Sequence, residues 1–98
     1  SLLVNPSHPG EVLQELYLAP LGLSSIALAR RIHVPRTRIE RLVKGETALS
    51  ADTAMRLAKV FGTTPEYCRN LQRAWDLARV REKVTALCRR LPVYGVRA

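Results

Sequence analysis

Residues 22–45 constrain the fold of this chain more than any other stretch. They contain two short helical patterns separated by a bend at His33 and Val34. Each pattern repeats its apolar residues at helical spacing and so buries one stripe. These stripes are Leu28, Ala29 and Ile32 in the first pattern, and Ile39, Leu42 and Val43 in the second. The sequence therefore predicts two short helices packed against one core through a tight turn.

The second helical pattern places basic residues away from its apolar stripe. With about 100° of rotation per residue, an inward stripe leaves the opposite face to polar side chains. Thr37, Arg41 and Lys44 then point outward, while Arg36 and Arg38 flank the first turn. This pattern predicts a surface that enters a groove of DNA.

A length of 98 residues suits a single domain over residues 1–98. Charge is spread unevenly along this domain. Residues 1–23 carry −2, whereas residues 24–46 carry +4 (six basic, two acidic) and residues 69–90 carry +5 (seven basic, two acidic). A positive field over the helix pair favours contact with DNA phosphates. The alternative is a positive surface that only keeps the protein in solution.

The sequence also predicts the location of the protein in the cell and the absence of a metal ion or cofactor. No apolar run approaches the roughly 20 residues of a membrane span, and the first residues lack the pattern of a signal peptide. We expect a cytoplasmic, nucleoid-associated protein with no membrane contact. Cys68 and Cys88 have no companion Cys or His at metal spacing, so we expect no metal ion. We expect both to be reduced thiols, with Cys88 packed on an apolar stripe; the alternative is a disulfide or redox switch. We also expect no cofactor.

The residue pattern predicts an all-α fold of five helices and no strand. Capping residues and helix breakers set the expected bounds. Pro20 and Gly22 are expected to stop the first helix, and Pro35 to begin the third without a side-chain cap. The five helices are Pro9–Ala19, Ser24–Ile32, Pro35–Gly45, Ser50–Gly62 and Thr64–Arg90. Residues 9–62 would form the core, and residues 65–90 an extended C-terminal helix.

The C-terminal helix carries an apolar seam of five residues spaced 3, 4, 3 and 4, as in a heptad repeat. The seam consists of Leu77, Val80, Val84, Leu87 and Leu91. It predicts an interface with a second copy or another partner; the alternative is packing against the first helix of the same chain. Trp75 is expected to anchor the helix to the core with Leu71 and Ala78, or to take part in that interface.

Several short motifs, in this order, resemble one family. They are His8-Pro9-Gly10-Glu11, Pro20-Leu21-Gly22-Leu23, Ala29, Lys44-Gly45, the run from Ala51 to Ala58, Gly62-Thr63-Thr64-Pro65-Glu66, Asn70-Leu71-Gln72 and Asp76-Leu77. Over about 70 residues the chain resembles the HigA-type antitoxins of the XRE, or lambda-repressor-like, helix-turn-helix class. The resemblance implies a homodimer that represses its own operon at an inverted repeat of double-stranded DNA. It also implies a partner, a HigB-like toxin of the RelE class that cuts mRNA.

The resemblance assigns DNA-binding roles by position. Arg36, Thr37, Glu40 and Arg41 match positions that read base edges in the wider class; the alternatives are phosphate contacts for the arginines and an ion pair with Arg36 or Lys44 for Glu40. Arg38 and Lys44 are expected to contact phosphates or to be solvated charges. Ser25 stands where the class commonly has a longer Gln, so its reach to a phosphate is shorter.

Three positions depart from the pattern of the family. His33 replaces a common glycine at the bend, which indicates either a left-handed conformation or a different turn. Pro35 replaces the usual Ser or Thr cap, and Cys68 replaces a large aromatic, which leaves the local packing open.

The sequence contains no nucleophile and base in a recognisable arrangement and no phosphate-binding glycine loop, so we expect no enzymatic activity. The two histidines, His8 and His33, do not indicate a catalytic site. His8 belongs to the entry of the first helix, where a structural hydrogen bond is expected, and His33 lies at the bend. Two other functions remain open. One is a protein-binding antitoxin with little specific DNA binding, and the other is a stand-alone, phage-type regulator without a toxin.

Overall fold

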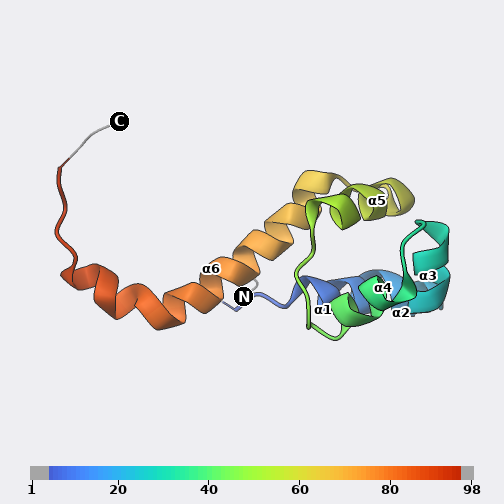
Figure 1. Cartoon of the computed structure of the whole chain (residues 1–98), viewed down its shortest axis with the longest axis horizontal. Helices are drawn as coiled ribbons and strands as arrows, with labels where there is room; N and C mark the ends of the chain where they lie inside the picture. Colours follow the sequence, from blue (N-terminus) through green and yellow to red (C-terminus); the bar gives the residue numbers. More distant parts are fainter. Residues whose placement is uncertain (1–4, 96–98) are drawn as a thin grey trace.

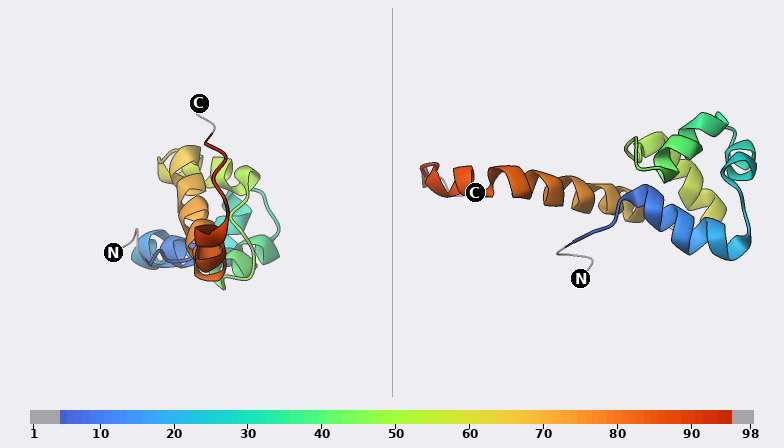
Figure 2. Two further views of the ribbon diagram at one scale, coloured as in Figure 1. Left: turned by 90° about the vertical axis from the view of Figure 1, so that its left-hand side faces the viewer. Right: turned by 90° about the horizontal axis from the view of Figure 1, so that it is seen from below.

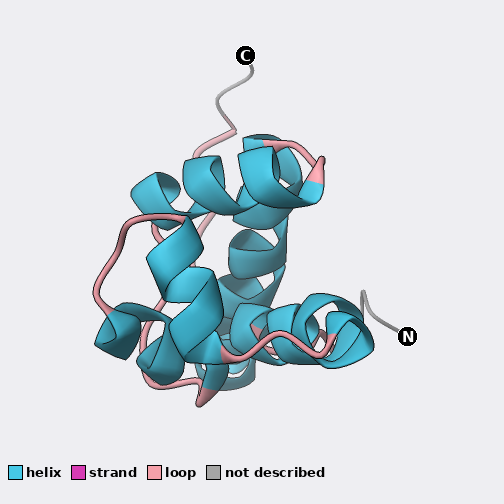
Figure 3. Cartoon of the chain, turned by 90° about the vertical axis from the view of Figure 1, so that its right-hand side faces the viewer, coloured by secondary structure: helices cyan, strands magenta, loops and turns pink. Residues whose placement is uncertain are grey.

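The computed structural model describes residues 5–95, and every regular element among them is helical (Figure 1, Figure 3). The elements are α1 (Pro9–Leu13), η1 (Gln14–Leu18), α2 (Ala19–Leu21), α3 (Ser25–Arg31), α4 (Arg36–Val43), α5 (Ala51–Phe61) and α6 (Pro65–Arg90). The first three follow without a break and form one helix, so the five-helix, lambda-repressor-like prediction is confirmed. No single described helix is long and apolar enough to cross a membrane; only the α1–α2 helix and α3 together, across a 92° bend, reach that length and composition.

The first helix differs from its prediction, because Pro20 does not stop it. The helix continues to Leu21 and ends at Gly22, which has a φ of 61°. A π-helical turn, η1, lies directly before the proline, and there the Ala19 N–H bonds to the carbonyl of Gln14, five residues back. The wider turn already interrupts the regular hydrogen-bond ladder, so the missing N–H of Pro20 falls where the ladder is broken.

The other helix starts agree with the capping signals. The side chains of Ser24, Ser50 and Thr64 each accept a hydrogen bond from the backbone N–H three residues on. Pro35 has extended backbone and lies one residue before α4 rather than in its first turn, and as the N-cap residue it provides no side-chain cap. Local residue chemistry therefore fixes where α3, α5 and α6 begin.

One apolar core joins the helices. Leu28 of α3 and Ile39 of α4 have no exposed surface, and complete burial of such side chains contributes about 1.5–3 kcal/mol each. The core consists of Leu13, Leu18, Leu28, Ala29, Ile32, Ile39, Leu42, Leu49, Ala54, Leu57 and Cys68. Because α4 supplies two of its members, the core fixes which face of α4 points outward.

Helix α6 packs on the domain only at its N-terminal end, where it contacts α5 and α1. Gln72 is buried there, and its side-chain oxygen accepts a hydrogen bond from the Leu49 N–H at 2.7 Å. The rest of α6 projects away from the other helices and makes the molecule 51 Å long against 25 and 24 Å in the other directions (Figure 2). Much of this helix is not covered by the other described residues.

Candidate nucleic-acid interface

The turn between α3 and α4 contains the left-handed residue that the sequence left open. His33 has a φ of 60°, the only positive φ of a non-glycine residue in the described part of the chain. The N–H of Val34 bonds to the carbonyl of Ala29 at 3.0 Å, and that of His33 to the carbonyl of Arg30 at 3.4 Å. These two bonds form a Schellman motif, which ends α3 and redirects the chain into α4.

Helix α4 has one buried face and one exposed face. Ile39 and Leu42 are in the core, with 0% and 2% of their surface exposed. The exposed side chains include all five that the helical pattern directs outward or beside the outer face: Arg36, Thr37, Arg38, Arg41 and Lys44. Glu40 is partly buried on the same helix, and Ser25 is partly buried at the start of α3. The structure therefore presents a basic helix face to solvent.

Two ion pairs on α4 and the residues after it restrain its outer arginines. Arg36 Nε lies 3.9 Å from Glu40 Oε1, and Arg41 Nε lies 3.7 Å from Glu46 Oε1. Glu40 therefore pairs with Arg36 rather than with Lys44, one of the two ion-pair alternatives. These pairs are largely exposed, so each contributes at most about 1 kcal/mol and is screened by salt. Both arginines can exchange such partners for an anionic ligand.

Arg38 has a stronger partner that the sequence analysis missed. Its Nη1 donates to Asp52 Oδ2 at 2.6 Å, and Arg56 Nε donates to the same oxygen at 3.1 Å. Arg38 and Asp52 line a groove between α4 and the start of α5, together with Thr37 and Arg41. The i, i+4 spacing of Asp52 and Arg56 is a visible signal for their pair. Fourteen residues separate Arg38 from Asp52, and no sequence pattern joins them.

His8 and Trp75 meet at the entry of the first helix, a contact that the sequence did not reveal. His8 caps α1, since its Nδ1 accepts the Gly10 N–H at 2.9 Å, as predicted for a structural histidine. Burial lowers the pKa of this imidazole, which favours the neutral ring that accepts the bond. The Trp75 ring meets His8 edge-on at 5.1 Å, and the Arg79 guanidinium lies 5.2 Å from the Trp75 centroid. Trp75 thus connects α6 to the entry of α1.

The apolar seam on α6 is not covered by the first helix of the chain, so that alternative is wrong. Leu77, Val80, Leu87 and Leu91 expose 46%, 51%, 49% and 53% of their surface, and Val84 is partly buried. Cys88 is also exposed, which contradicts its expected packing. The reason is the same for all of them, because this part of α6 projects beyond the other helices (Figure 1).

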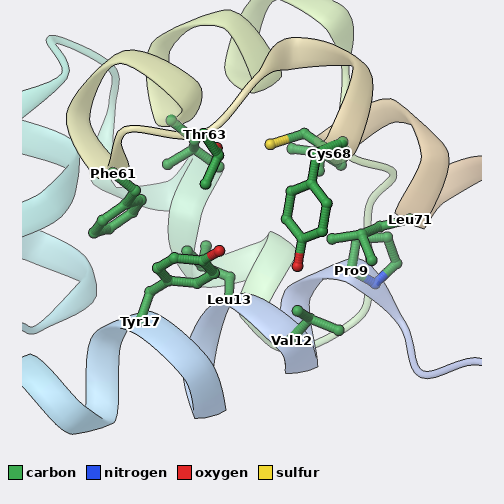
Figure 4. A pocket seen from close by; sticks show the side chains of 11 residues that line it. Pro9, Val12, Leu13, Tyr17, Phe61, Thr63, Cys68 and Leu71 are labelled. Carbon is green, nitrogen blue, oxygen red and sulfur yellow. The ribbon is translucent and has the colours of Figure 1, made fainter. Parts of the chain in front are cut away.

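Cys68 lies in the core beside a small apolar cavity between α1, α5 and α6 (Figure 4). Only 6% of its surface is exposed, and burial raises the pKa of its thiol. The Tyr17 and Phe61 rings, whose centroids are 4.8 Å apart, line the same cavity. Although Cys68 replaces a large aromatic of the family, its small side chain is buried in the core and its thiol stays protonated.

Comparison with known proteins identifies the family. Residues 13–68 match the family model described as "Helix-turn-helix". "Antitoxin HigA-1" of Vibrio cholerae is 40% identical over 72 residues, which cover 74% of this chain and 68% of that protein. The chain belongs to the HigA-type helix-turn-helix family. The structure of Pseudomonas aeruginosa antitoxin HigA with the higBA promoter superimposes on this HigA-type chain with a TM-score of 0.87 and 29% identity, covering 94% of this chain and 100% of that one.

Other relatives are longer than this chain or are transcriptional regulators without a named toxin. "Virulence-associated protein I" of Dichelobacter nodosus is 47% identical over 70 residues, which cover 71% of this HigA-type chain and 65% of that protein. The chain therefore spans just under two thirds of the length of this relative. Further relatives are uncharacterised HTH-type transcriptional regulators. The regulators, HigA-1 and the matching family model belong to a helix-turn-helix family, and they indicate no catalytic family.

Proposed function

We propose that this HigA-type chain is the antitoxin of a type II toxin–antitoxin pair and represses its own operon. The observation that carries the DNA-binding half is the exposed basic face of α4, held by the buried pair Ile39 and Leu42. The relative solved with its promoter supports the same role for this chain. Phosphate contacts supply affinity for any duplex, so a repressor also needs side chains that reach base edges.

We assign base reading to Arg36, Thr37 and Arg41, with Glu40 held against Arg36 by their ion pair. The planar fork of an arginine can pair with the O6 and N7 atoms of guanine in the major groove. Lys44 at the end of α4 and Ser25 at the start of α3 are assigned phosphate contacts. Arg38 is the exception among the basic residues, because Asp52 already accepts from it.

We propose that the repressor is a homodimer assembled through the seam on α6. Leu77, Val80, Leu87 and Leu91 are each about half exposed on a helix that projects from the domain. Residues at heptad spacing bury such a stripe by packing against a second helix of the same kind. In such a dimer, two copies of α4, the proposed recognition helix, would lie about 34 Å apart and meet an inverted repeat on successive major-groove faces.

Replacing Arg36 and Arg41 with alanine is expected to reduce sequence preference more than affinity for arbitrary DNA. Fluorescence anisotropy at about 150 mM salt, with the upstream DNA and a scrambled duplex, measures both. The unaltered protein should prefer its upstream DNA by a factor of roughly a thousand. Each substitution should cost about 1–3 kcal/mol on the upstream duplex if the arginine reads a base.

Arg73→Ala is the matched control, because it removes one exposed positive charge from α6, which does not belong to the proposed DNA surface. It should leave the preference for upstream DNA unchanged. Equal weakening of both duplexes by the α4 substitutions would reassign the two arginines to phosphates. Equal weak binding of both duplexes by the unaltered protein would refute sequence-specific repression and favour an antitoxin that binds only protein.

We further propose that the partner is a HigB-like mRNA endoribonuclease encoded beside this chain. Expression of the neighbouring reading frame alone should arrest growth, and co-expression of this chain should restore growth and give a stable complex on size-exclusion chromatography. The uncharacterised regulators among the relatives favour one other function, a regulator without a toxin. A harmless neighbour that forms no complex would support that function instead.

A further inference from the structure

Asp52 holds two arginines from different helices on one carboxylate oxygen. Its Oδ2 accepts from Arg38 Nη1 of α4 at 2.6 Å and from Arg56 Nε of α5 at 3.1 Å. Hydrogen bonds from both arginines lower the pKa of this carboxyl, so the group is charged at neutral pH. With two cations on one anion, the cluster keeps a local excess of one positive charge.

Arg56 also connects this cluster to the turn between α3 and α4. Its Nη1 donates to the carbonyl of Ile32 at 2.7 Å and reaches the carbonyl of His33 at 3.4 Å. His33 is the residue with the left-handed backbone at that turn. A continuous chain of hydrogen bonds therefore runs from the turn, through α5, to the first turn of the recognition helix. Through it, the position of Arg38 is tied to the geometry of the helix-turn-helix unit.

The Arg38 side chain is exposed on the surface that we propose for DNA binding. It is 43% exposed beside the groove that Thr37 and Arg41 also line. Carboxylate and phosphate oxygens are the same kind of acceptor for a guanidinium group. A phosphate that approaches this groove must compete with Asp52 for the donors of Arg38.

We propose that Asp52 withholds Arg38 from DNA phosphates and thereby limits binding to DNA of the wrong sequence. The inference rests on the proposed DNA-binding function. Affinity for arbitrary DNA comes from phosphate contacts, so one cation fewer in that set weakens it directly. An operator also offers base edges to α4, and its affinity depends less on Arg38. Discrimination by an element that weakens the wrong complex is a general route to specificity.

Asp52→Asn tests the proposal, since it keeps the size of the side chain and removes its charge. We expect the scrambled duplex to bind several-fold more tightly at about 150 mM salt, with a salt slope steeper by about one phosphate contact. The upstream duplex should change by less than this factor, so the ratio of the two affinities should fall. The double variant Asp52→Asn/Arg38→Ala should lose the gain, because Arg38 is the group released.

Two further variants separate this effect from net charge and from folding. Glu15→Gln makes the same charge change on η1, at an exposed residue that belongs to no ion pair among the described residues, and should give no comparable gain. Asp52→Glu keeps the carboxylate and should retain the wild-type affinity ratio. Thermal unfolding of every variant verifies that the helices remain folded.

The outcomes distinguish this inference from the proposed function. A gain on scrambled DNA that persists without Arg38, an equal gain in Glu15→Gln, or no gain at all would overturn the role of Asp52. A wild-type protein that binds both duplexes equally would refute the proposed repressor. In that case the Arg38-dependent gain on the scrambled duplex would still decide whether Asp52 withholds this side chain from phosphates.

Discussion

Replacement of Gly10 with alanine is expected to lower the free energy of unfolding by several kcal/mol, a large part of the roughly 5–15 kcal/mol of a typical domain. A Cβ at this buried position would lie 1.7 Å from the Leu42 carbonyl oxygen and 3.1 Å from Val43 Cα. Both atoms belong to the backbone of α4, so no side-chain rotation relieves the overlap. The two helices would have to separate, which opens the core beneath the recognition helix.

Helix propensity alone predicts the opposite sign for this substitution. Gly10 is in the first turn of α1, where alanine favours a helix by up to about 1 kcal/mol. Gly22→Ala is the control, because its Cβ would meet no atom of the described residues within 4 Å, and its φ of 61° opposes the change. That strain costs about 1–2 kcal/mol. Urea unfolding followed by circular dichroism measures both; a Gly10→Ala protein as stable as the unaltered one would show that α1 and α4 tolerate separation.

Close approach at Gly10 explains a motif that the sequence analysis could use only as a resemblance. In the run from His8 to Glu11, the histidine caps α1, the proline is buried, the glycine admits the α4 backbone, and the glutamate is exposed in the first turn. Capping and helix-start preferences are local and readable from sequence. The need for glycine arises from α4, more than thirty residues further on, and has no local signal.

The helix starts at Ser24, Ser50 and Thr64 were predictable for the same local reason, whereas the register of the first helix was not. Regular helical spacing pairs Val12 with Leu16 on one apolar stripe, yet Leu16 is 62% exposed. The buried leucines are Leu13 and Leu18, five residues apart, because η1 adds a residue to the turn between them. The π-helical turn lies just before Pro20, and a period of 3.6 does not reveal it.

The candidate site also has a part that the sequence predicts and a part that only the fold provides. A helical wheel was enough to put Arg36, Arg38 and Arg41 on the exposed face of α4, since periodicity and burial determine that face. Their acidic partners were only partly visible. Glu40 lies four residues from Arg36, whereas Asp52 reaches Arg38 only because the fold brings the start of α5 to the first turn of α4. Arg38 was expected to contact phosphate, and only the fold supplies its competing anion.

Replacement of Leu87 with aspartate is expected to convert the proposed dimer to monomers and to lower affinity for the upstream DNA by a factor of about 100 or more. Leu87 lies in the seam with 49% of its surface exposed in the single chain, so the substitution removes no contact from the core. In a dimer it would bury an unpaired carboxylate, which costs several kcal/mol. A monomer also loses the second half-site, and linked sites bind about 10²–10⁴-fold more tightly than one alone. Sedimentation velocity and anisotropy measure the two effects.

Ala86→Asp is the matched control, because it adds the same charge one residue away, about 100° around the helix and off the seam. It should sediment as the unaltered protein does and bind DNA with similar affinity. Both variants should keep the helical circular dichroism of the parent, since both residues are exposed and the C-terminal part of α6 projects away from the other helices in Figure 2. A Leu87→Asp protein that remains dimeric would place the interface elsewhere and leave the seam to another partner. A monomer that still binds upstream DNA at full affinity would separate operator recognition from dimerisation and contradict the inverted-repeat geometry.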